Sequence, residues 1–201
     1  MEVVVSVATG SHEVAAHGHV AHFYRHHADL AERAGDYLAA GVADGGVALT
    51  MATPEHRLAV EERMAGAGVD VSAARASGDY LALDAEETLN RLVSGSRPDR
   101  ARFELVIGGL IHRATSCGRA VRACGELAAM LWEAGLVAGA IEFEELWNSL
   151  GRRYPCGLWC AYPAAQMATG GLADSITDVC TRHALIIGDV PGRPGPAIPA
   201  T

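Results

Sequence analysis

The six residues VALTMA, which run from Val47 to Ala52, decide the fold class of this chain. A short, continuous apolar run of this kind is typical of a strand that is buried on both faces of a parallel sheet. Thr53 and Pro54 follow directly and predict the start of a helix, with Thr53 as the N-cap and Pro54 at the first position. A buried strand that leads straight into a helix is the repeating unit of an α/β fold.

The same alternation of strands and helices continues on both sides of this unit. Further strands are predicted at 19–24, 80–83, 119–124 and 157–162. The segments between them predict helices, most clearly the segment 97–114, whose apolar residues share one face. Strands separated by helices indicate a mostly parallel sheet of about five or more strands, covered by helices in a three-layer core.

The predicted ends of two helices depend on single residues. The apolar stripe from Leu30 to Leu38 predicts a helix that ends at Gly41, because glycine is common just past the end of a helix. Asp84 and Glu87 form a capping box, which predicts that a helix begins at this point. Asp84 is therefore interpreted as a helix cap.

The length of the chain predicts one domain with a real core, since half of its 201 residues are hydrophobic. We expect a leader at 1–15, a domain at 16–187 and a flexible tail rich in proline and glycine at 188–201. The first residues lack the basic region of a signal peptide, and no run approaches the roughly 18 apolar residues of a membrane span. The cytoplasm is therefore the expected location, where the five cysteines would be thiols.

The charge pattern argues against several partners and chemistries. The formal net charge of −8 argues against a nucleic-acid surface and against binding to an anionic membrane. All positive residues are arginine, so no lysine is present to form a Schiff base or to grip a phosphate. The segment MATPEHRLAV also lacks the glycines of a phosphate loop. No G-x-S-x-G motif occurs either, and we therefore expect a protein without catalytic activity.

Four histidines lie close together in the stretch GHVAHFYRHHADL, which begins at Gly18. If HVAHFY is a strand, as its alternation and its aromatic residues indicate, His19 and His22 point to opposite faces of the sheet. Ligands of open α/β sheets bind at the carboxyl ends of the strands, which makes Tyr24 and His26 candidate pocket residues. His22 is open to two interpretations, a pocket residue or a core histidine with satisfied hydrogen bonds.

The candidate ligand-binding residues come from strand ends and from the helices between them. Six side chains form this prediction: His22, Tyr24, Glu126, Trp147, Tyr162 and His183. Cys160 and Cys180 are expected nearby. Cys180 and His183 are one helical turn apart, which leaves a Cys/His hydrolase as an alternative. A second alternative is a metal- or haem-binding site made from His19, His22, Cys180 and His183.

The order of several short motifs along the chain points to a known family. HFY is followed by MATPEHR, GVDV, LDAEETL and RPDRARF, and then by VRACGELAAMLWEAG, EFEELWNSL, CAYP and CTRHA. In this order, from His19 to His183, the chain resembles the MEDS domain, a bacterial and archaeal sensory module named for methanogens, methylotrophs and the dichloromethane regulator DcmR. The chain departs from the family at Cys124 and Leu127 and in the segment PCGLWC, whose extra cysteines leave room for a redox or metal role.

The resemblance implies a RecA- or KaiC-like core without a working phosphate loop, and a role in sensing small hydrocarbon derivatives in transcription regulation and signalling. Because no output module is evident, we expect a stand-alone sensor that binds a small organic ligand and signals through a protein partner. The apolar helix faces would also suit a homodimer. This interpretation requires no cofactor, whereas the alternatives require haem or a transition metal, or a nucleotide in a degenerate site.

Overall fold

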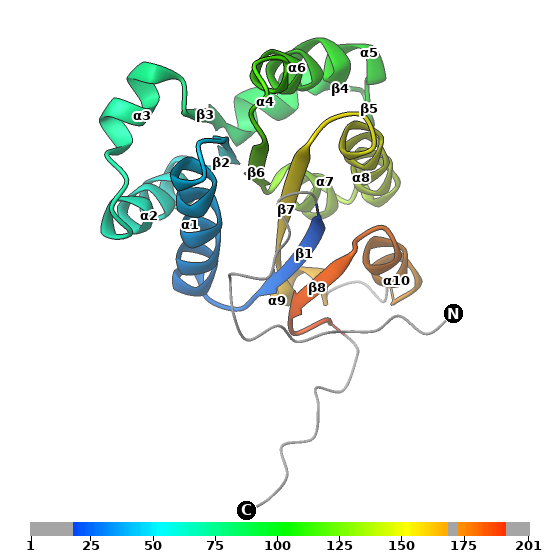
Figure 1. Ribbon diagram of the computed structural model, residues 1–201. Coiled ribbons are helices and arrows are strands. Elements are labelled where there is room, and N and C mark those ends of the chain that lie inside the picture. The colour runs from blue at the N-terminus through cyan, green and yellow to red at the C-terminus, as the bar shows by residue number, and fades with distance from the viewer. Residues whose placement is uncertain (1–17, 169–172, 192–201) are drawn as a thin grey trace, which may run out of the picture.

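Parallel strands form the centre of the molecule. The computed structural model describes residues 18–168 and 173–191, and within these ranges six parallel strands form one sheet in the order β3-β2-β6-β7-β1-β8 (Figure 1). Their bounds are β1 (His19–Tyr24), β2 (Val47–Ala52), β3 (Tyr80–Asp84), β6 (Val121–Gly125), β7 (Cys156–Pro163) and β8 (Leu185–Gly188). The predicted α/β class with a mostly parallel sheet is therefore confirmed.

Helices cover both faces of this sheet and complete three layers, consistent with the core that the resemblance implies (Figure 1). One face is covered by α1 (His27–Ala43), α2 (Pro54–Gly66) and α3 (Val71–Ser77). The other is covered by α4 (Ala85–Leu92), α5 (Arg100–Phe103), η2 (Glu104–Gly108), α6 (Gly109–Ser116), α7 (Leu127–Glu133), α8 (Val137–Gly151), α9 (Ala164–Met167) and α10 (Ala173–Thr181). A short antiparallel pair, β4 (Val93–Ser94) and β5 (Arg97–Pro98), lies between α4 and α5 in the chain.

The alternation of side chains along the strands divides the core into two parts. In β1, Ala21 and Phe23 join the core beneath α7, α8 and α10, whereas Val20 and Tyr24 join the core beneath α1. The same alternation in β7 turns Trp159 toward α1. Because successive residues of a strand point to opposite faces, the place of every functional side chain on β1 and β7 follows from its position in the strand.

The predicted helix starts are confirmed by their caps. Pro54 is the first residue of α2, and Oγ1 of Thr53 accepts a hydrogen bond from the backbone N–H of His56 at 3.5 Å. At the start of α4, the carboxylate of Asp84 accepts a hydrogen bond from the backbone N–H of Glu87 at 2.9 Å. Asp84 is therefore a helix cap, as its place in the sequence predicts.

The predicted end of the first helix at Gly41 is wrong, because α1 continues to Ala43. Gly41 permits close packing instead, since a Cβ there would lie 2.9 Å from Cδ of Arg122. The glycine with positive φ after α1 is Gly45, with a φ of 77°. Several short elements were not predicted: α3, which begins after the N-cap Asp70, the antiparallel pair β4 and β5, the helix α9 and the four-residue strand β8.

The long helix predicted at 97–114 is present as three consecutive pieces, α5, η2 and α6, which run from Arg100 to Ser116. Its fully buried residues Phe103, Ile107 and Ile111 recur at every fourth position, which is wider than the α-helical period of about 3.6 residues. The π-helical piece η2 widens one turn of the helix, and this keeps all three side chains on the face that meets the core.

The predicted domain boundaries are only partly covered by the structure. The leader at 1–15 lies outside the described residues, and so does the predicted tail from 192 onward. β8 ends at Gly188, beside the predicted end of the domain at 187. Within the described ranges, no helix combines the length and the apolar character that a bilayer crossing requires.

Replacing Gly188 with alanine should destabilise the pairing of β8 with β1. Gly188 has a φ of 84°, and a Cβ there would lie 2.1 Å from the carbonyl oxygen of Phe23. Gly68→Ala is the matched control, because Gly68 has a φ of 94° and nothing lies within 4 Å of the added Cβ. In urea denaturation, we expect Gly188→Ala to lower the unfolding free energy by about 1–3 kcal/mol more than Gly68→Ala. Equal losses in the two variants would contradict this contact.

Candidate functional site

A chain of hydrogen bonds at the carboxyl edge of the sheet connects three ionisable side chains. Glu126 follows β6, and its Oε2 lies 2.7 Å from Nδ1 of His56 in the first turn of α2. Nε2 of His56 lies 2.5 Å from Nδ1 of His27, the first residue of α1. The other carboxylate oxygen of Glu126 accepts the backbone N–H of Thr53 at 2.5 Å. The ends of β2 and β6 are thereby joined to the starts of α1 and α2.

Tyr24 adds an aromatic ring to this chain from the last position of β1. Its ring centroid lies 6.0 Å from that of His27 and 6.0 Å from that of His56. We refer to Tyr24, His27, Thr53, His56 and Glu126 as the carboxyl-edge array. Glu126 and His56 are buried, whereas His27 is exposed. The array therefore leads from a buried carboxylate to the surface of the protein.

The array lies where the connections from neighbouring strands leave toward opposite faces of the sheet. β2 continues into α2 on one face, while its neighbour β6 continues into α7 on the other. Likewise, β1 continues into α1, while its neighbour β7 continues into α9 on the opposite face. In open α/β sheets, a change of direction of this kind at the carboxyl edge marks the general location of ligand sites.

The electrostatics of the array favour a charged pair beside a neutral phenol. The hydrogen bond to Glu126 raises the pKa of His56 above its ordinary value, although burial acts in the opposite direction. Burial, reinforced by the negative charge of Glu126, raises the pKa of Tyr24, so its hydroxyl keeps its proton. Below its raised pKa, His56 is an imidazolium that donates a hydrogen bond to Glu126.

His22 lies in the core beneath α1 and outside the array. It is fully buried, its Nε2 lies 2.9 Å from Oδ2 of Asp29, and its ring meets the ring of Trp159 edge-on at 5.4 Å. Burial lowers the pKa of His22, against the effect of the neighbouring Asp29. Asp29 is itself paired with Arg33 at 2.7 Å. These contacts are those of a core histidine that is tied to the start of α1.

A second cluster of polar side chains lies between α8 and the sheet, with the fully buried carboxylate of Glu144 at its centre. Oε2 of Glu144 lies 3.0 Å from Nε2 of His19 and 3.5 Å from Nε2 of His183. Sγ of Cys160 lies 3.3 Å from the same oxygen. The hydroxyl of Tyr162 donates a hydrogen bond to the other oxygen, Oε1. We refer to these residues as the Glu144 cluster.

The charge state of the Glu144 cluster follows from its burial and its neighbours. Burial alone would raise the pKa of Glu144, but the imidazoles of His183 and His19 outweigh burial and hold this pKa well below its usual range. Burial and the negative charge of Glu144 raise the pKa of both Cys160 and Tyr162. The centre of the cluster is therefore an ionised carboxylate that receives hydrogen bonds from a thiol and a phenol.

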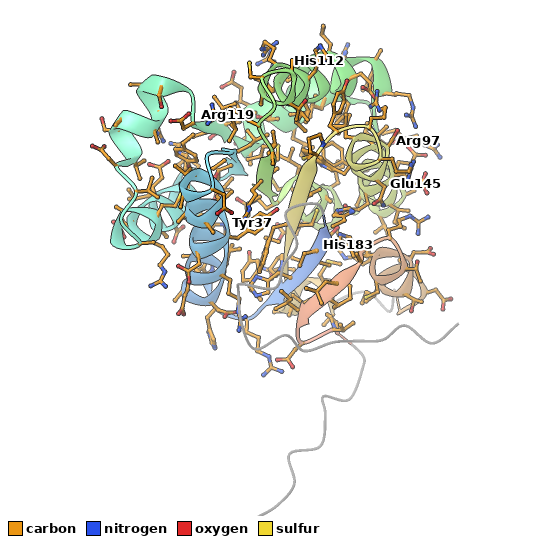
Figure 2. The ribbon with its side chains drawn as sticks, viewed as in Figure 1. Tyr37, Arg97, His112, Arg119, Glu145 and His183 are labelled. Atoms are coloured by element: carbon orange, nitrogen blue, oxygen red, sulfur yellow. The ribbon has the colours of Figure 1, made fainter. Side chains whose placement is uncertain are left out.

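The Glu144 cluster adjoins an open pocket of about 410 Å³ at the amino ends of β1, β7 and β8. His19 and His183 line this pocket together with Trp147 and Asn148, and the side chain of His19 is 11% exposed. Figure 2 shows His183 beside the amino ends of β1 and β8. The two histidines therefore separate the buried carboxylate from the pocket.

The predicted ligand residues fall into separate places. Tyr24 and Glu126 meet in the carboxyl-edge array, whereas Tyr162 and His183 meet in the Glu144 cluster. His183 is not at the carboxyl edge, where it was predicted, because α10 returns the chain to the amino end of β8. Trp147 is buried in the core and its ring centroid lies 5.3 Å from that of Phe103. The sixth predicted residue, His22, lies in the core beneath α1 and belongs to neither group.

The alternative set of metal ligands is only partly brought together. His19 and His183 are adjacent, with ring centroids 4.0 Å apart. His22 points to the opposite face of the sheet, as its position in β1 predicts. Cys180 is buried in α10, and the thiol that lies beside Nε2 of His19, at 3.3 Å, belongs to Cys160. In the structure, Glu144 and Cys160 therefore lie beside His19 and His183, in place of the predicted His22 and Cys180.

Three members of these sites were missed in the sequence. Glu144 carries a detectable signal, because it lies on the same face of α8 as Ala140 and Trp147, and a carboxylate within an apolar stripe indicates a buried charge. His27 and His56 carry no such signal. They are 29 residues apart in the chain and meet only through the fold.

Replacing Glu126 with glutamine should lower the pKa of His56 toward 6.5, because it weakens the hydrogen bond to the carboxylate and removes the negative charge, both of which raise this pKa. The raised pKa stabilises the folded state fully below 6.5, and this contribution is lost as the pH rises through the folded-state pKa. The difference in unfolding free energy between wild type and Glu126→Gln should therefore shrink as the pH rises from about 6. NMR titration of the imidazole signals and urea denaturation measure the two effects.

Glu133→Gln provides the control for this titration. Glu133 is exposed and raises the pKa of His56 through its charge alone, without a hydrogen bond. We expect a smaller change in the pKa of His56 in Glu133→Gln than in Glu126→Gln. A pKa of His56 that is the same in wild type and Glu126→Gln would refute the proposed charge pair.

An alkylating reagent should modify Cys117 before the other cysteines of the folded protein. Cys117 is exposed, whereas the other four thiols are buried. Burial raises the pKa of Cys156 to about 12 and also raises the pKa of Cys124, and the thiolate is the reactive form. Peptide mapping by mass spectrometry after short exposure at neutral pH measures the order of modification. A Cys180 that reacts faster than Cys117 would instead favour the Cys/His hydrolase.

Comparison with known proteins identifies the family. The family model described as MEDS, methanogen/methylotroph, DcmR sensory domain, matches residues 18–183. No curated protein matches the chain. The matched range begins one residue before β1 and ends before β8, so it contains both the carboxyl-edge array and the Glu144 cluster. Because the match covers most of the 201 residues, this chain belongs to the MEDS family of sensory domains.

Proposed function

We propose that this sensory domain binds a small organic molecule at the carboxyl edge of its sheet, and that a protein partner recognises the bound state. The domain has no catalytic role in this proposal. Membership of the MEDS family supports the sensory role. The carboxyl-edge array supports the place of binding, because it offers polar groups beside an aromatic ring.

The observation that carries this proposal is that side chains from four parts of the chain meet at the carboxyl edge, where the connections after neighbouring strands leave toward opposite faces of the sheet. Tyr24 ends β1, His27 begins α1, His56 lies in the first turn of α2, and Glu126 follows β6. A strand end and the starts of three helices hold these side chains in place at the edge of the sheet, which is the usual way in which an α/β fold builds a ligand site. The buried pair of His56 and Glu126 would suffice for stability alone, yet the hydrogen bonds continue outward to the exposed His27.

The array is suited to a hydroxyl or carboxylate group on a small hydrocarbon. The exposed His27 is the outermost polar group, and its imidazole donates or accepts a hydrogen bond according to its tautomer. The raised pKa of His56 favours a positive charge behind His27, which favours an oxygen acceptor as the ligand atom. The ring of Tyr24 contributes apolar surface, which small-molecule sites commonly combine with a few polar groups.

A nucleotide fits the same edge less well. Phosphate binding at a helix start uses free backbone N–H groups and the positive end of the helix dipole. In the first turn of α1 stands the carboxylate of Asp29, and in the first turn of α2 stands that of Glu55. Both negative charges oppose a phosphate, and the chain has no lysine to offset them.

Helix α2 offers a route from the ligand to a partner. His56 lies in the first turn of this helix, and Leu58, two residues later, is a large apolar side chain that is 59% exposed. A ligand that binds one arrangement of the array better than another shifts the population toward that arrangement. We therefore assign the partner surface to the exposed side of α2. A partner captured equally well with and without ligand would contradict this assignment.

A ligand titration followed by ¹⁵N NMR tests the proposed binding site. The probes are short-chain alcohols and short-chain carboxylates, with ATP as a separate arm. We expect an alcohol or a carboxylate to shift the amide signals of Thr53, His56 and Glu126, and to be recovered chemically unchanged. Shifts at these amides from ATP alone would favour the degenerate nucleotide site, and a chemically altered probe would favour an enzyme.

The variant His56→Ala should weaken binding of the best probe by about tenfold or more, because it removes the positive charge and the hydrogen bond that support His27, and a hydrogen bond to a charged group contributes about 1.5–3 kcal/mol. His112→Ala is the matched control, because His112 is exposed on α6 (Figure 2), and α6 contributes no residue to the array. Thermal denaturation verifies that both variants are folded. If the two variants bind the probe equally well, the array is not the binding site.

A further inference from the structure

We propose that His19, Glu144, Cys160 and His183 bind a single Zn²⁺ ion. These four side chains come from β1, α8, β7 and the connection between α10 and β8. They belong to the Glu144 cluster at the amino edge, and so the proposed zinc site is separate from the carboxyl-edge array. It therefore goes beyond the proposed function and does not depend on it.

The spacing of the donor atoms matches a tetrahedral zinc site. Bonds of about 2.0 Å to nitrogen and oxygen and about 2.3 Å to sulfur set the edges of such a tetrahedron at about 3.3–3.6 Å. Oε2 of Glu144 lies 3.0 Å from Nε2 of His19, 3.5 Å from Nε2 of His183 and 3.3 Å from Sγ of Cys160. All four donor atoms lie within 4.8 Å of one another. The donor pairs that are farthest apart would therefore approach one another by at most about 1.5 Å when the ion binds.

The hydrogen bonds of the two imidazoles fix their ring nitrogens in the manner of metal ligands. Nδ1 of His183 lies 2.7 Å from the carbonyl oxygen of Val179, which can only accept, so this nitrogen carries the hydrogen. Nδ1 of His19 lies 3.0 Å from Oδ1 of Asn148, which also accepts. Both Nε2 atoms therefore turn a lone pair toward the carboxylate of Glu144 in the neutral tautomer. Metal-bound histidines almost always show this arrangement.

The lone pairs on Nε2 of His19 and His183 face the carboxylate of Glu144 in the core, and they need a positive charge between them. Nε2 of His183 is buried and makes no hydrogen bond, although a carboxylate oxygen lies 3.5 Å away. Protons on the imidazoles would supply the charge, and so would a divalent cation. A Zn²⁺ ion with the carboxylate of Glu144 and the thiolate of Cys160 forms a neutral group, and neutrality matters because an uncompensated charge is costly to bury. On binding, the thiol of Cys160 releases its proton to solvent.

The surroundings of the cluster supply support for the ligands and access for the ion. The hydroxyl of Tyr162 donates to Oε1 of Glu144 and thereby leaves Oε2 for the metal. Nδ2 of Asn148 donates to the carbonyl oxygen of Arg182 at 3.0 Å, which fixes the amide that orients His19. The pocket of about 410 Å³ reaches both histidines and gives the ion a path from solvent. A supported ligand set with an access route is what a metal site requires.

Zn²⁺ fits this donor set better than haem or a hard cation. Two nitrogens, one sulfur and one oxygen suit zinc, whereas calcium and magnesium prefer oxygen ligands alone. Haem is bound by axial ligands above and below a flat macrocycle, whereas these donors converge on one point. Four protein ligands also leave no open position, which is typical of a structural zinc site. The ion would tie α8 and the connection after α10 to the sheet.

Cobalt titration of the metal-free, untagged full chain tests the site, because Co²⁺ occupies the same kind of site as Zn²⁺ and absorbs visible light. We expect saturation at about one Co²⁺ per chain, with tetrahedral d–d bands and a thiolate-to-cobalt charge-transfer band that Zn²⁺ abolishes. X-ray absorption of the zinc-bound wild type should show one sulfur among the four ligands. Folded wild type without these cobalt bands, or zinc bound without sulfur, would overturn the proposal.

Cys160→Ser and Cys156→Ser form a matched pair for the same titration. Both cysteines are buried in β7 and belong to the same core, but the thiol of Cys156 donates to the carbonyl oxygen of Gly157 at 3.6 Å. We expect Cys160→Ser to lose the charge-transfer band and Cys156→Ser to keep it. The reverse result would place the metal elsewhere. If Cys160→Ser does not fold, the X-ray absorption of the wild type decides.

Asn148→Ala tests the positioning of His19. Loss of a side chain that orients a metal ligand weakens metal affinity by about 10- to 100-fold. We expect a loss of this size in Asn148→Ala and none in His112→Gln, measured by competition with a chromophoric zinc chelator. His112 serves as the control because it is exposed on α6 and lies outside the Glu144 cluster. Equal affinity of the two variants would show that the metal is not held through His19.

Discussion

The carboxylate of Glu144 is fully buried between α8 and the sheet, and an ionised carboxylate in this position needs compensation from the groups around it. His19, Cys160, Tyr162 and His183 provide that compensation from three strands or strand ends. The requirement constrains the packing of α8 and the path of the chain after α10. A hydrophobic residue at position 144 would not need these polar partners. The cluster therefore fixes the arrangement of α8 and of the chain after α10 more strictly than apolar contacts alone would.

Much of the fold followed from local patterns in the sequence. The apolar run at β2 and the Thr53–Pro54 pair predicted a buried strand and the start of α2, and both are present. The alternation in β1 also placed His19 and His22 on opposite faces, which the two cores confirm. These predictions succeeded because strand alternation and helix caps depend on neighbours within a few residues. The MEDS resemblance, which depended on motif order, is confirmed by the family match.

The sites were harder to predict because they depend on contacts between distant residues. His56 lies 70 residues from Glu126, and Cys160 lies 141 residues from His19. His183 was predicted at the carboxyl edge, but a residue that follows a helix and precedes a parallel strand lies at the amino edge of the sheet. Only Glu144 carried a local signal, a carboxylate within the apolar stripe of α8. Sequence patterns therefore identified candidate residue types but could not pair them.

The two sites lie at opposite edges of the sheet, and one path through the described structure connects them. His183 lies two residues before the start of β8, and after β8 the side chain of Asp189 pairs with Arg25 at 2.7 Å. Arg25 lies two residues before His27, the exposed end of the carboxyl-edge array. β8 is a four-residue strand that pairs with β1, so it is the element of this path that can shift most readily.

The ion pair between Arg25 and Asp189 limits how strongly the two sites can be coupled along this path. Arg25 and Asp189 are both largely exposed, with side-chain exposures of 68% and 52%. An exposed ion pair contributes about 1 kcal/mol or less, which corresponds to about a fivefold change in affinity between coupled sites. An ion bound at His183 would therefore act on the carboxyl-edge array mainly by holding β8 in register with β1. The pairing of Phe23 with Gly188, where a carbonyl oxygen leaves no room for a Cβ, is the contact through which such register is kept.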